Sequence, residues 1–325
     1  MKSIICDAFG PISQLRFDEC PTPTAGAGQL LIDVKAIGIN FPDALLVQGL
    51  YQVKPATPFV PGFEFSGEVT AIGDGVSNFA VGDRIACVSE LFGAFAEQTA
   101  AFAKNAVLIP DDMSYPDAAT ILCAHATAHH GLKQRARLRE GETLLVLGAA
   151  GGTGSAAVQI GKAMGARVIA ACSTADKLAA AAANGADELI NYRQQDLKSS
   201  LKALTGGRGV DVVYDPVGGK AFDASVRCMA RNGRLLVVGF ASGDIPSLSA
   251  NLALVKEFSL IGVLWGSFVA HEPQQFADNM SELFGWYQQG KVSSVIDEAL
   301  PLAEAATALT RVMDRLVCGK LVLIP

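Results

Sequence analysis

The sequence contains no uninterrupted apolar run approaching the roughly 20 residues that a membrane-spanning helix needs. Its first residues, Met1 to Asp7, have the pattern of a strand rather than of a cleavable signal. Blocks of like charge are absent too, and the formal net charge of −6 gives no electrostatic basis for binding nucleic acid. These absences predict a cytoplasmic protein with neither a membrane nor a nucleic-acid partner.

Cysteines in a pairing pattern are also missing. The chain has seven cysteines, an odd number, and no two of them form a C-x-x-C pair. Such a set fits neither a disulfide framework nor a zinc knuckle, so we expect free thiols in a reducing compartment.

Charged residues are scarce, at 18% of the chain, whereas 50% of the residues are hydrophobic. This balance indicates a globular protein that buries a large interior. At 325 residues the chain exceeds the usual size of a single core, so we expect two domains.

One stretch joins an apolar run to a glycine-rich turn. Residues 143–147 have the length of a strand, and residues 155–164 resume apolar positions at helical spacing. Between them, Ala149, Gly151 and Gly154 form the dinucleotide-binding fingerprint with alanine in place of its first glycine. Such a turn lets a pyrophosphate approach the backbone and the helix N-terminus closely. The residues predicted to bind it are Ala150, Gly151, Gly152, Thr153 and Gly154. An ordinary strand-to-helix turn is the alternative.

The strand expected at residues 165–172 has no Asp or Glu near its end, where an NAD-selective fold places an acid for the ribose hydroxyls. It ends instead in Ser173 and Thr174. Lys177 lies one helical turn beyond, and Tyr192 follows the next strand-like run. Hydroxyls and a lysine suit a 2′-phosphate, so the predicted cofactor is NADPH. The alternatives are that Ser173 caps the next helix and that Lys177 is a solvated surface charge.

The amino-terminal part of the chain, to about residue 122, has many short strand-like segments joined by glycines, which predicts a partly open barrel. Three of its motifs are Asn40-Phe41-Pro42-Asp43, Pro61-Gly62-Phe63-Glu64-Phe65-Ser66-Gly67 and Val81-Gly82-Asp83-Arg84. In that order and spacing they resemble the medium-chain dehydrogenase/reductase superfamily. Within it, they resemble the zinc-free quinone oxidoreductase (zeta-crystallin-like) branch.

The resemblance covers essentially the whole chain, and it implies the fold. We expect an α/β protein with a Rossmann doubly wound parallel sheet over residues 123–262, which bind NADPH. Residues 1–122 and 263–325 should form a GroES-like, strand-rich partly open barrel domain. Relatives are usually dimers, which implies a homodimer through edge strands near residues 240–264.

The same resemblance allows the metal positions to be compared. In the zinc alcohol dehydrogenases of the superfamily, a Cys, a His and a second Cys hold the catalytic metal. Asn40 and Phe63 stand at the first two positions here, and Cys123 falls near the third. A single thiolate cannot assemble the three-ligand site of a catalytic zinc, so we expect no metal. His125 and His129, four residues apart, are the alternative metal ligands.

Without zinc, the oxyanion formed during hydride transfer must be stabilised by hydrogen-bond donors. Asn40 and Tyr51 are the candidates, and Asn40 is also expected to contact the cofactor. A phenol is protonated at pH 7, so Tyr51 can donate to a quinone oxygen or an enone carbonyl. Related enoyl-thioester reductases use a tyrosine after the same Gln-Gly segment as a proton donor; a loop tyrosine packed over the cleft is the alternative. Asp43 should orient Asn40 or cap the short helix that follows it.

The remaining predicted cofactor contacts lie farther along the chain. Thr127 matches a family position whose hydroxyl approaches the nicotinamide carboxamide, with a core-facing threonine as the alternative. Gly239, Phe240 and Ala241 follow a strand-like run. They should border the nicotinamide, because open α/β sheets bind ligands beyond the carboxyl ends of their strands. Trp265 either lines the cleft or fills the core.

The predicted activity is hydride transfer from NADPH to small molecules, either quinones or activated, electron-poor alkenes, without zinc. One alternative is an enoyl-thioester or alkenal reductase, which needs a longer and more basic cleft mouth; no arginine cluster in the sequence supplies it. The other is an NADPH-binding protein with little catalysis, a role known among relatives.

Overall fold

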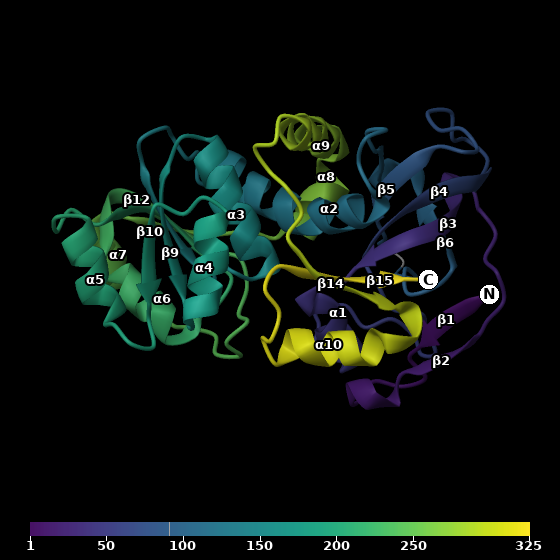
Figure 1. Cartoon of the computed structure of the whole chain (residues 1–325), viewed down its shortest axis with the longest axis horizontal. Helices are drawn as coiled ribbons and strands as arrows, with labels where there is room; N and C mark the ends of the chain where they lie inside the picture. Colours follow the sequence, from purple (N-terminus) through teal and green to yellow (C-terminus); the bar gives the residue numbers. More distant parts are fainter. Residues whose placement is uncertain (91) are drawn as a thin grey trace. The chain divides into compact units, whose positions relative to one another are not determined.

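The structure, a computed structural model, describes residues 1–90 and 92–325 (Figure 1). The chain divides into two compact units. The first unit comprises residues 1–123, 272–280 and 294–325, and the second comprises residues 124–271 and 281–293. The helix after the last strand of the second unit packs within that unit.

The second unit is built around a six-stranded sheet in which every hydrogen-bonded pair is parallel. Its strands are β8 (Thr143–Leu147), β9 (Arg167–Cys172), β10 (Glu188–Asn191), β11 (Val210–Asp215), β12 (Met229–Val237) and β13 (Ser259–Gly262). They lie in the order β10-β9-β8-β11-β12-β13, which is the doubly wound Rossmann order with its reversal between β8 and β11. The predicted fold class is confirmed here.

Helices cover both faces of this sheet (Figure 1). They are α3 (Gly152–Ala163), α4 (Ala175–Ala183), α5 (Leu197–Leu204), α6 (Gly219–Val226) and α7 (Ala250–Lys256). A further helix, α8 (Trp265–His271), follows β13. On one face, Leu145 of β8 shares a core with Leu201 of α5 and Phe222 of α6. On the other, Leu144 lies so near Gly161 of α3 that a Cβ there would be 2.6 Å from its Cδ2. Because successive strand residues point to opposite faces, this two-sided cover explains why β8 is buried at every position.

The first unit is built around a seven-stranded sheet. Its strands are β3 (Gln29–Gly38), β4 (Glu64–Ile72), β5 (Arg84–Val88), β6 (Gln98–Phe102), β7 (Ala106–Leu108), β14 (Ile296–Pro301) and β15 (Lys320–Ile324). The order is β14-β15-β3-β4-β5-β7, and β6 also pairs with β3. Every pair is antiparallel except β14-β15. A two-stranded sheet of β1 (Lys2–Ile5) and β2 (Arg16–Glu19) accompanies it. The strand-rich, GroES-like character predicted for this part is confirmed.

Four further helices complete the fold. They are α1 (Phe41–Val47), α2 (Tyr115–His129), α9 (Pro273–Gln288) and α10 (Ala305–Met313). α2 is continuous and runs on into a π-helical segment, His130–Arg135. In the described part of the chain, none of the helices combines the length and the hydrophobicity needed to cross a membrane.

Two glycines shape the turn between β8 and α3. Gly148 has a φ of 59°, in the left-handed region. A Cβ on Gly154 would lie only 2.1 Å from the carbonyl oxygen of Gly148, so a larger residue would force the first turn of α3 away from the strand. A Cβ on Gly151 would lie 3.5 Å from the same oxygen, an ordinary contact.

We predict that Gly154→Ala lowers the free energy of unfolding by about 2 kcal/mol or more, because backbone must shift to admit the methyl group. Gly151→Ala, at the N-cap of the same helix, should lower the free energy of unfolding by no more than about 1 kcal/mol, because a methyl group fits there without a clash. Urea unfolding of both variants without added cofactor measures the difference. Equal stabilities would contradict the packing role of Gly154.

Candidate functional site

Glu64, at the start of β4, has a fully buried carboxylate that links three other segments of the first unit. Its Oε2 accepts hydrogen bonds from Asn40 Nδ2 (2.8 Å) and from Lys320 Nζ (2.9 Å). Its Oε1 accepts the backbone N–H of Cys123 (2.5 Å). Lys320 is itself only 6% exposed and also donates to Asn40 Oδ1 (2.6 Å). Burying such a pair is costly, and the additional hydrogen bonds offset that cost.

These contacts occupy both amide hydrogens of Asn40. Its Nδ2 donates to Glu64 and to the carbonyl oxygen of Gly38 (3.2 Å), while its Oδ1 accepts from Lys320. An amide has two donor hydrogens, so this arrangement leaves Asn40 none to give to a substrate oxygen. Sequence reasoning missed Glu64 and Lys320, since the two lie 256 residues apart.

Asp43 caps α1. Its Oδ2 accepts the backbone N–H of Asn40 (2.7 Å), three residues earlier, which is the reciprocal half of a capping box. The carboxyl group is fully buried, and its Oδ1 has no hydrogen-bond partner among the described residues. Burial raises the pKa of Asp43 to about 7, because desolvation disfavours the charged form.

Tyr51 lies in the loop that follows α1, and its ring packs edge-on against Phe63 with centroids 5.6 Å apart. Phe63 in turn packs against Phe92, at 5.1 Å. Burial raises the pKa of Tyr51, so the phenol keeps its proton at neutral pH. Within the described part of the chain its hydroxyl makes no hydrogen bond. Of the two predicted donors, Tyr51 is therefore the one that is uncommitted.

In the second unit, the five residues predicted to bind pyrophosphate form the turn into α3. These are Ala150, Gly151, Gly152, Thr153 and Gly154. Gly151 is the N-cap of α3, and the first turn of the helix has no acidic residue to repel an anion. The first N–H groups of any helix lack intrahelical acceptors, so this end of α3 fits a phosphate. Sequence reasoning missed Tyr214 of β11, whose hydroxyl lies 2.5 Å from Thr153 Oγ1.

The residues predicted to hold a 2′-phosphate follow β9 and β10, which pair in parallel and end opposite each other. Ser173 and Tyr192 come directly after these strands, and the Tyr192 N–H donates to the carbonyl oxygen of Cys172 (3.1 Å). The alternative that Ser173 caps the next helix is wrong. Thr174 is the N-cap of α4, and its hydroxyl oxygen accepts the backbone N–H of Lys177 (3.3 Å).

The residues predicted to border the nicotinamide lie beyond β12. Gly239, Phe240 and Ala241 form a loop there, and the Ala241 N–H donates to the carbonyl oxygen of Pro216 (3.0 Å), which follows the neighbouring β11. The loop therefore lies at the carboxyl edge of the sheet, on the other side of β8 from β9 and β10.

Two further predicted residues differ in exposure. Thr127, on α2, is half-buried. Trp265 begins α8 and is only 6% exposed, which favours the alternative that it fills the core.

The two histidines considered as metal ligands have separate partners. His125 Nε2 lies 3.1 Å from Gln159 Oε1, and His129 Nε2 lies 2.8 Å from Glu282 Oε2. Burial lowers the pKa of His129, so its ring is neutral at pH 7. Across residues 1–90 and 92–325, no group of three or more His, Cys, Asp or Glu side chains could hold a metal ion.

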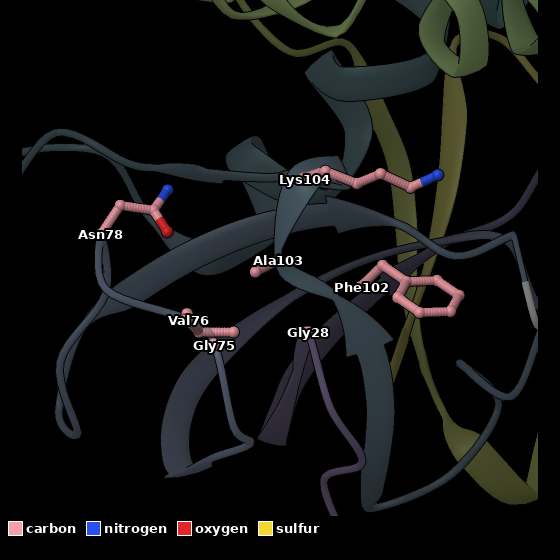
Figure 2. A pocket seen from close by; sticks show the side chains of 7 residues that line it. All are labelled: Gly28, Gly75, Val76, Asn78, Phe102, Ala103 and Lys104. Carbon is pink, nitrogen blue, oxygen red and sulfur yellow. The ribbon is translucent and has the colours of Figure 1, made fainter.

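A hollow of about 400 Å³ in the first unit lies away from this chemistry (Figure 2). Its lining consists of Gly28, Gly75, Val76, Asn78, Phe102, Ala103 and Lys104. These residues precede β3 and follow β4 and β6, whereas Asn40 and Glu64 lie at the opposite ends of β3 and β4. That separation is about 30 Å along a strand of β3's length. Among its polar lining residues, Lys104 pairs with Glu90 (3.1 Å).

Two family models match the chain, the alcohol dehydrogenase GroES-like domain over residues 26–111 and the zinc-binding dehydrogenase over residues 152–284. The chain is 36% identical to a quinone oxidoreductase-like protein 2 homolog of Nematostella vectensis, over 99% of this chain and 88% of that protein.

Solved structures match over the full length. A mycobacterial protein complexed with NADPH is 34% identical, with a TM-score of 0.94 and 100% of both chains covered. Escherichia coli quinone oxidoreductase complexed with NADPH is 29% identical, with a TM-score of 0.93 and 100% of both chains covered. The similarity therefore extends over both units of the chain.

We predict that the stability of the protein relative to Asp43→Asn falls between pH 4 and pH 7.5. The pKa of Asp43 is about 7 in the folded protein and has its ordinary value of 3.8 in the unfolded chain. The contribution of this carboxyl to stability is therefore greatest below pH 4. It is lost as the pH rises through about 7, because the unfolded chain gains a solvated charge that the buried site disfavours. The asparagine does not titrate and keeps an oxygen for the Asn40 N–H. Urea unfolding across this range should show the difference changing by up to about 4 kcal/mol. A pH-independent difference would contradict the buried, poorly solvated carboxyl.

Proposed function

The chain belongs to the quinone oxidoreductase branch of the medium-chain dehydrogenase/reductase superfamily, and on that premise we propose that it transfers a hydride from NADPH to quinones or activated alkenes without a metal ion. One observation carries the proposal. The glycine-rich turn after β8, which suits a pyrophosphate, lies at the same edge of the sheet as the end of β9, where the hydroxyl residues Ser173 and Thr174 stand in place of an acidic residue. Similar proteins are named quinone oxidoreductases, and two similar structures are complexed with NADPH.

The second unit has residues suited to each part of this cofactor. The N–H groups at the start of α3 would hold the pyrophosphate, and Gly154 lets this first helical turn lie close to the end of β8, because a Cβ there would be 2.1 Å from the carbonyl oxygen of Gly148. Ser173, Lys177 and Tyr192 would hold the 2′-phosphate. We assign the nicotinamide end to four of the residues predicted for it, which are Thr127, Gly239, Phe240 and Ala241. Of the other two, Asn40 has its amide committed to Glu64 and Lys320, and Trp265 is buried. Bound NADPH supplies the hydride.

In the first unit, Tyr51 would donate a hydrogen bond to the acceptor oxygen as negative charge develops on it. Its raised pKa keeps the proton in place until transfer, and packing against Phe63 holds the ring. The amide of Asn40 is fixed by Glu64 and Lys320, so its role would be to position α1 and the loop carrying Tyr51. Phe63 has no atom that binds a metal, which supports hydride transfer without one.

We also propose a cytoplasmic homodimer formed through β13. No disulfide joins any two of the seven cysteines, as a reducing compartment would ensure. β13 is the edge of the six-stranded sheet, where unpaired backbone groups invite a second strand. Exposed apolar side chains lie on and near it, between 46% and 78% exposed. These are Ile245, Leu254, Val255, Leu260 and Leu264.

The function is tested by following NADPH absorbance with 1,4-benzoquinone, 9,10-phenanthrenequinone, 2-hexenal and crotonyl-thioester, with NADH as the control. We expect turnover with the quinones or the alkenal. Turnover with the thioester alone would favour an enoyl-thioester reductase. NADPH binding without turnover of any acceptor would favour the cofactor-binding role.

Tyr51→Phe should lower kcat roughly tenfold, because it removes one hydrogen-bond donor from the acceptor oxygen, and a quinone needs less stabilisation than a carbonyl. The matched control is Tyr115→Phe, which keeps the ring that lies 4.7 Å from the Arg84 guanidinium carbon and removes only a hydroxyl. Full activity of Tyr51→Phe on every accepted substrate would remove the proposed role.

The dimer is tested by light scattering after size-exclusion chromatography. We expect twice the mass of one chain, and Leu260→Lys should shift the protein toward a monomer, because it places a charge on the edge strand. A monomeric wild-type protein at micromolar concentration would refute the proposed dimer.

A further inference from the structure

The carboxyl end of β11 holds a buried acid to which the proposed function assigns no role. Asp215 is 2% exposed, and its Oδ1 accepts the backbone N–H groups of Val217 (2.7 Å) and Gly218 (2.8 Å). These two bonds hold residues 216–218 in a tight turn. Gly218 has φ 73° and ψ −156°, a conformation almost confined to glycine, so the turn depends on the bonds that hold it.

This turn carries the loop after β12. The Ala241 N–H donates to Pro216 O (3.0 Å), and the Ser242 N–H donates to Val217 O (2.9 Å). The position of the loop is thereby set by the turn that Asp215 holds, rather than by β12 alone.

The same turn also contacts the start of the pyrophosphate-binding turn. A Cβ placed on Gly148 would lie 2.9 Å from Val217 Cγ2, so the valine methyl group lies directly over this glycine. β8, β11 and β12 are neighbours in the sheet, and their carboxyl ends face the same edge. The residue 216–218 turn therefore lies between the segment proposed to bind the pyrophosphate and the segment proposed to bind the nicotinamide.

We propose that Asp215 is a positioning residue for the nicotinamide half of NADPH. Its carboxylate folds the 216–218 turn, the turn holds the loop of Gly239, Phe240 and Ala241, and the loop borders the nicotinamide. Asp215 itself touches no part of the cofactor. This inference rests on the proposed NADPH-dependent function.

The proposal separates the two halves of the cofactor. The adenosine half is assigned to Ser173, Lys177 and Tyr192, which follow strands on the far side of β8 from β11. Displacing the 216–218 turn should therefore weaken contacts to the nicotinamide half and leave those to the adenosine 2′-phosphate in place.

The experiment measures dissociation constants by calorimetry for two probes, NADPH and adenosine 2′,5′-bisphosphate. Asp215→Ala should raise the Kd for NADPH roughly tenfold or more, since two buried N–H groups lose their acceptor. Its Kd for the bisphosphate should stay within about twofold of the wild-type value, because the residues assigned to the adenosine half are left in place. Asp215→Asn should bind both probes like the wild type, because its amide oxygen can accept the same two N–H groups.

A matched control lies on the same strand. Asp211, at the other end of β11, is also buried; it accepts the Thr143 N–H (2.8 Å) and pairs with Arg208 (2.6 Å). Asp211→Ala should lower stability without changing the Kd for NADPH. Gly218→Ala is a second route to the same turn, since its Cβ would lie 2.8 Å from Asp244 O, and it should repeat the NADPH-specific loss.

Unchanged NADPH binding in Asp215→Ala and Gly218→Ala would overturn the inference. Equal weakening of both probes would overturn it as well, because the acid would then only stabilise the unit. If Asp215→Ala does not fold, Gly218→Ala decides between these outcomes. A wild-type protein that binds the bisphosphate but not NADPH, or neither probe, would instead refute the proposed function.

Discussion

The parallel hydrogen bonding between β8 and β11 is the constraint on which the site depends, because the order of strands reverses at that pair. In an open α/β sheet, ligands bind beyond the carboxyl ends of the strands at this reversal. The segments that follow β8, β9, β10, β11 and β12 all emerge at that edge. Gly148 and Gly154 let the first of them turn tightly enough for the helix N-terminus to present its N–H groups.

The first unit depends on a different interaction, the buried ion pair between Glu64 and Lys320. It ties β15 to the start of β4, the cap of α1 and the backbone at Cys123. An ion pair without solvent is tolerated only where further hydrogen bonds complete it, and here Asn40 does so. The consequence for chemistry is that Asn40 is held in place, while the hydroxyl of Tyr51 is left to interact with an acceptor.

Local patterns in the sequence were sufficient for the fold class, the glycine turn and the strand-rich first domain. They also predicted that Ser173 and Tyr192 lie at the same edge of the sheet, because parallel strands that alternate with helices all end at one edge. Long-range contacts gave no such signal: Lys320 reaches Asn40 across 280 residues, and Tyr214 reaches Thr153 across 61. Thr174, not Ser173, is the N-cap of α4. Serine and threonine are both common N-caps, so sequence preference alone does not decide between two adjacent positions.

On the proposed function, the carboxyl edge of the six-stranded sheet selects a cofactor that carries a 2′-phosphate. Calorimetric titration of the wild-type protein with NADPH and with NADH, at one salt concentration, tests it most directly. NADPH should bind at least about tenfold more tightly than NADH, since one charge-assisted contact to the phosphate suffices for that ratio. Equal affinities, or tighter binding of NADH, would contradict it.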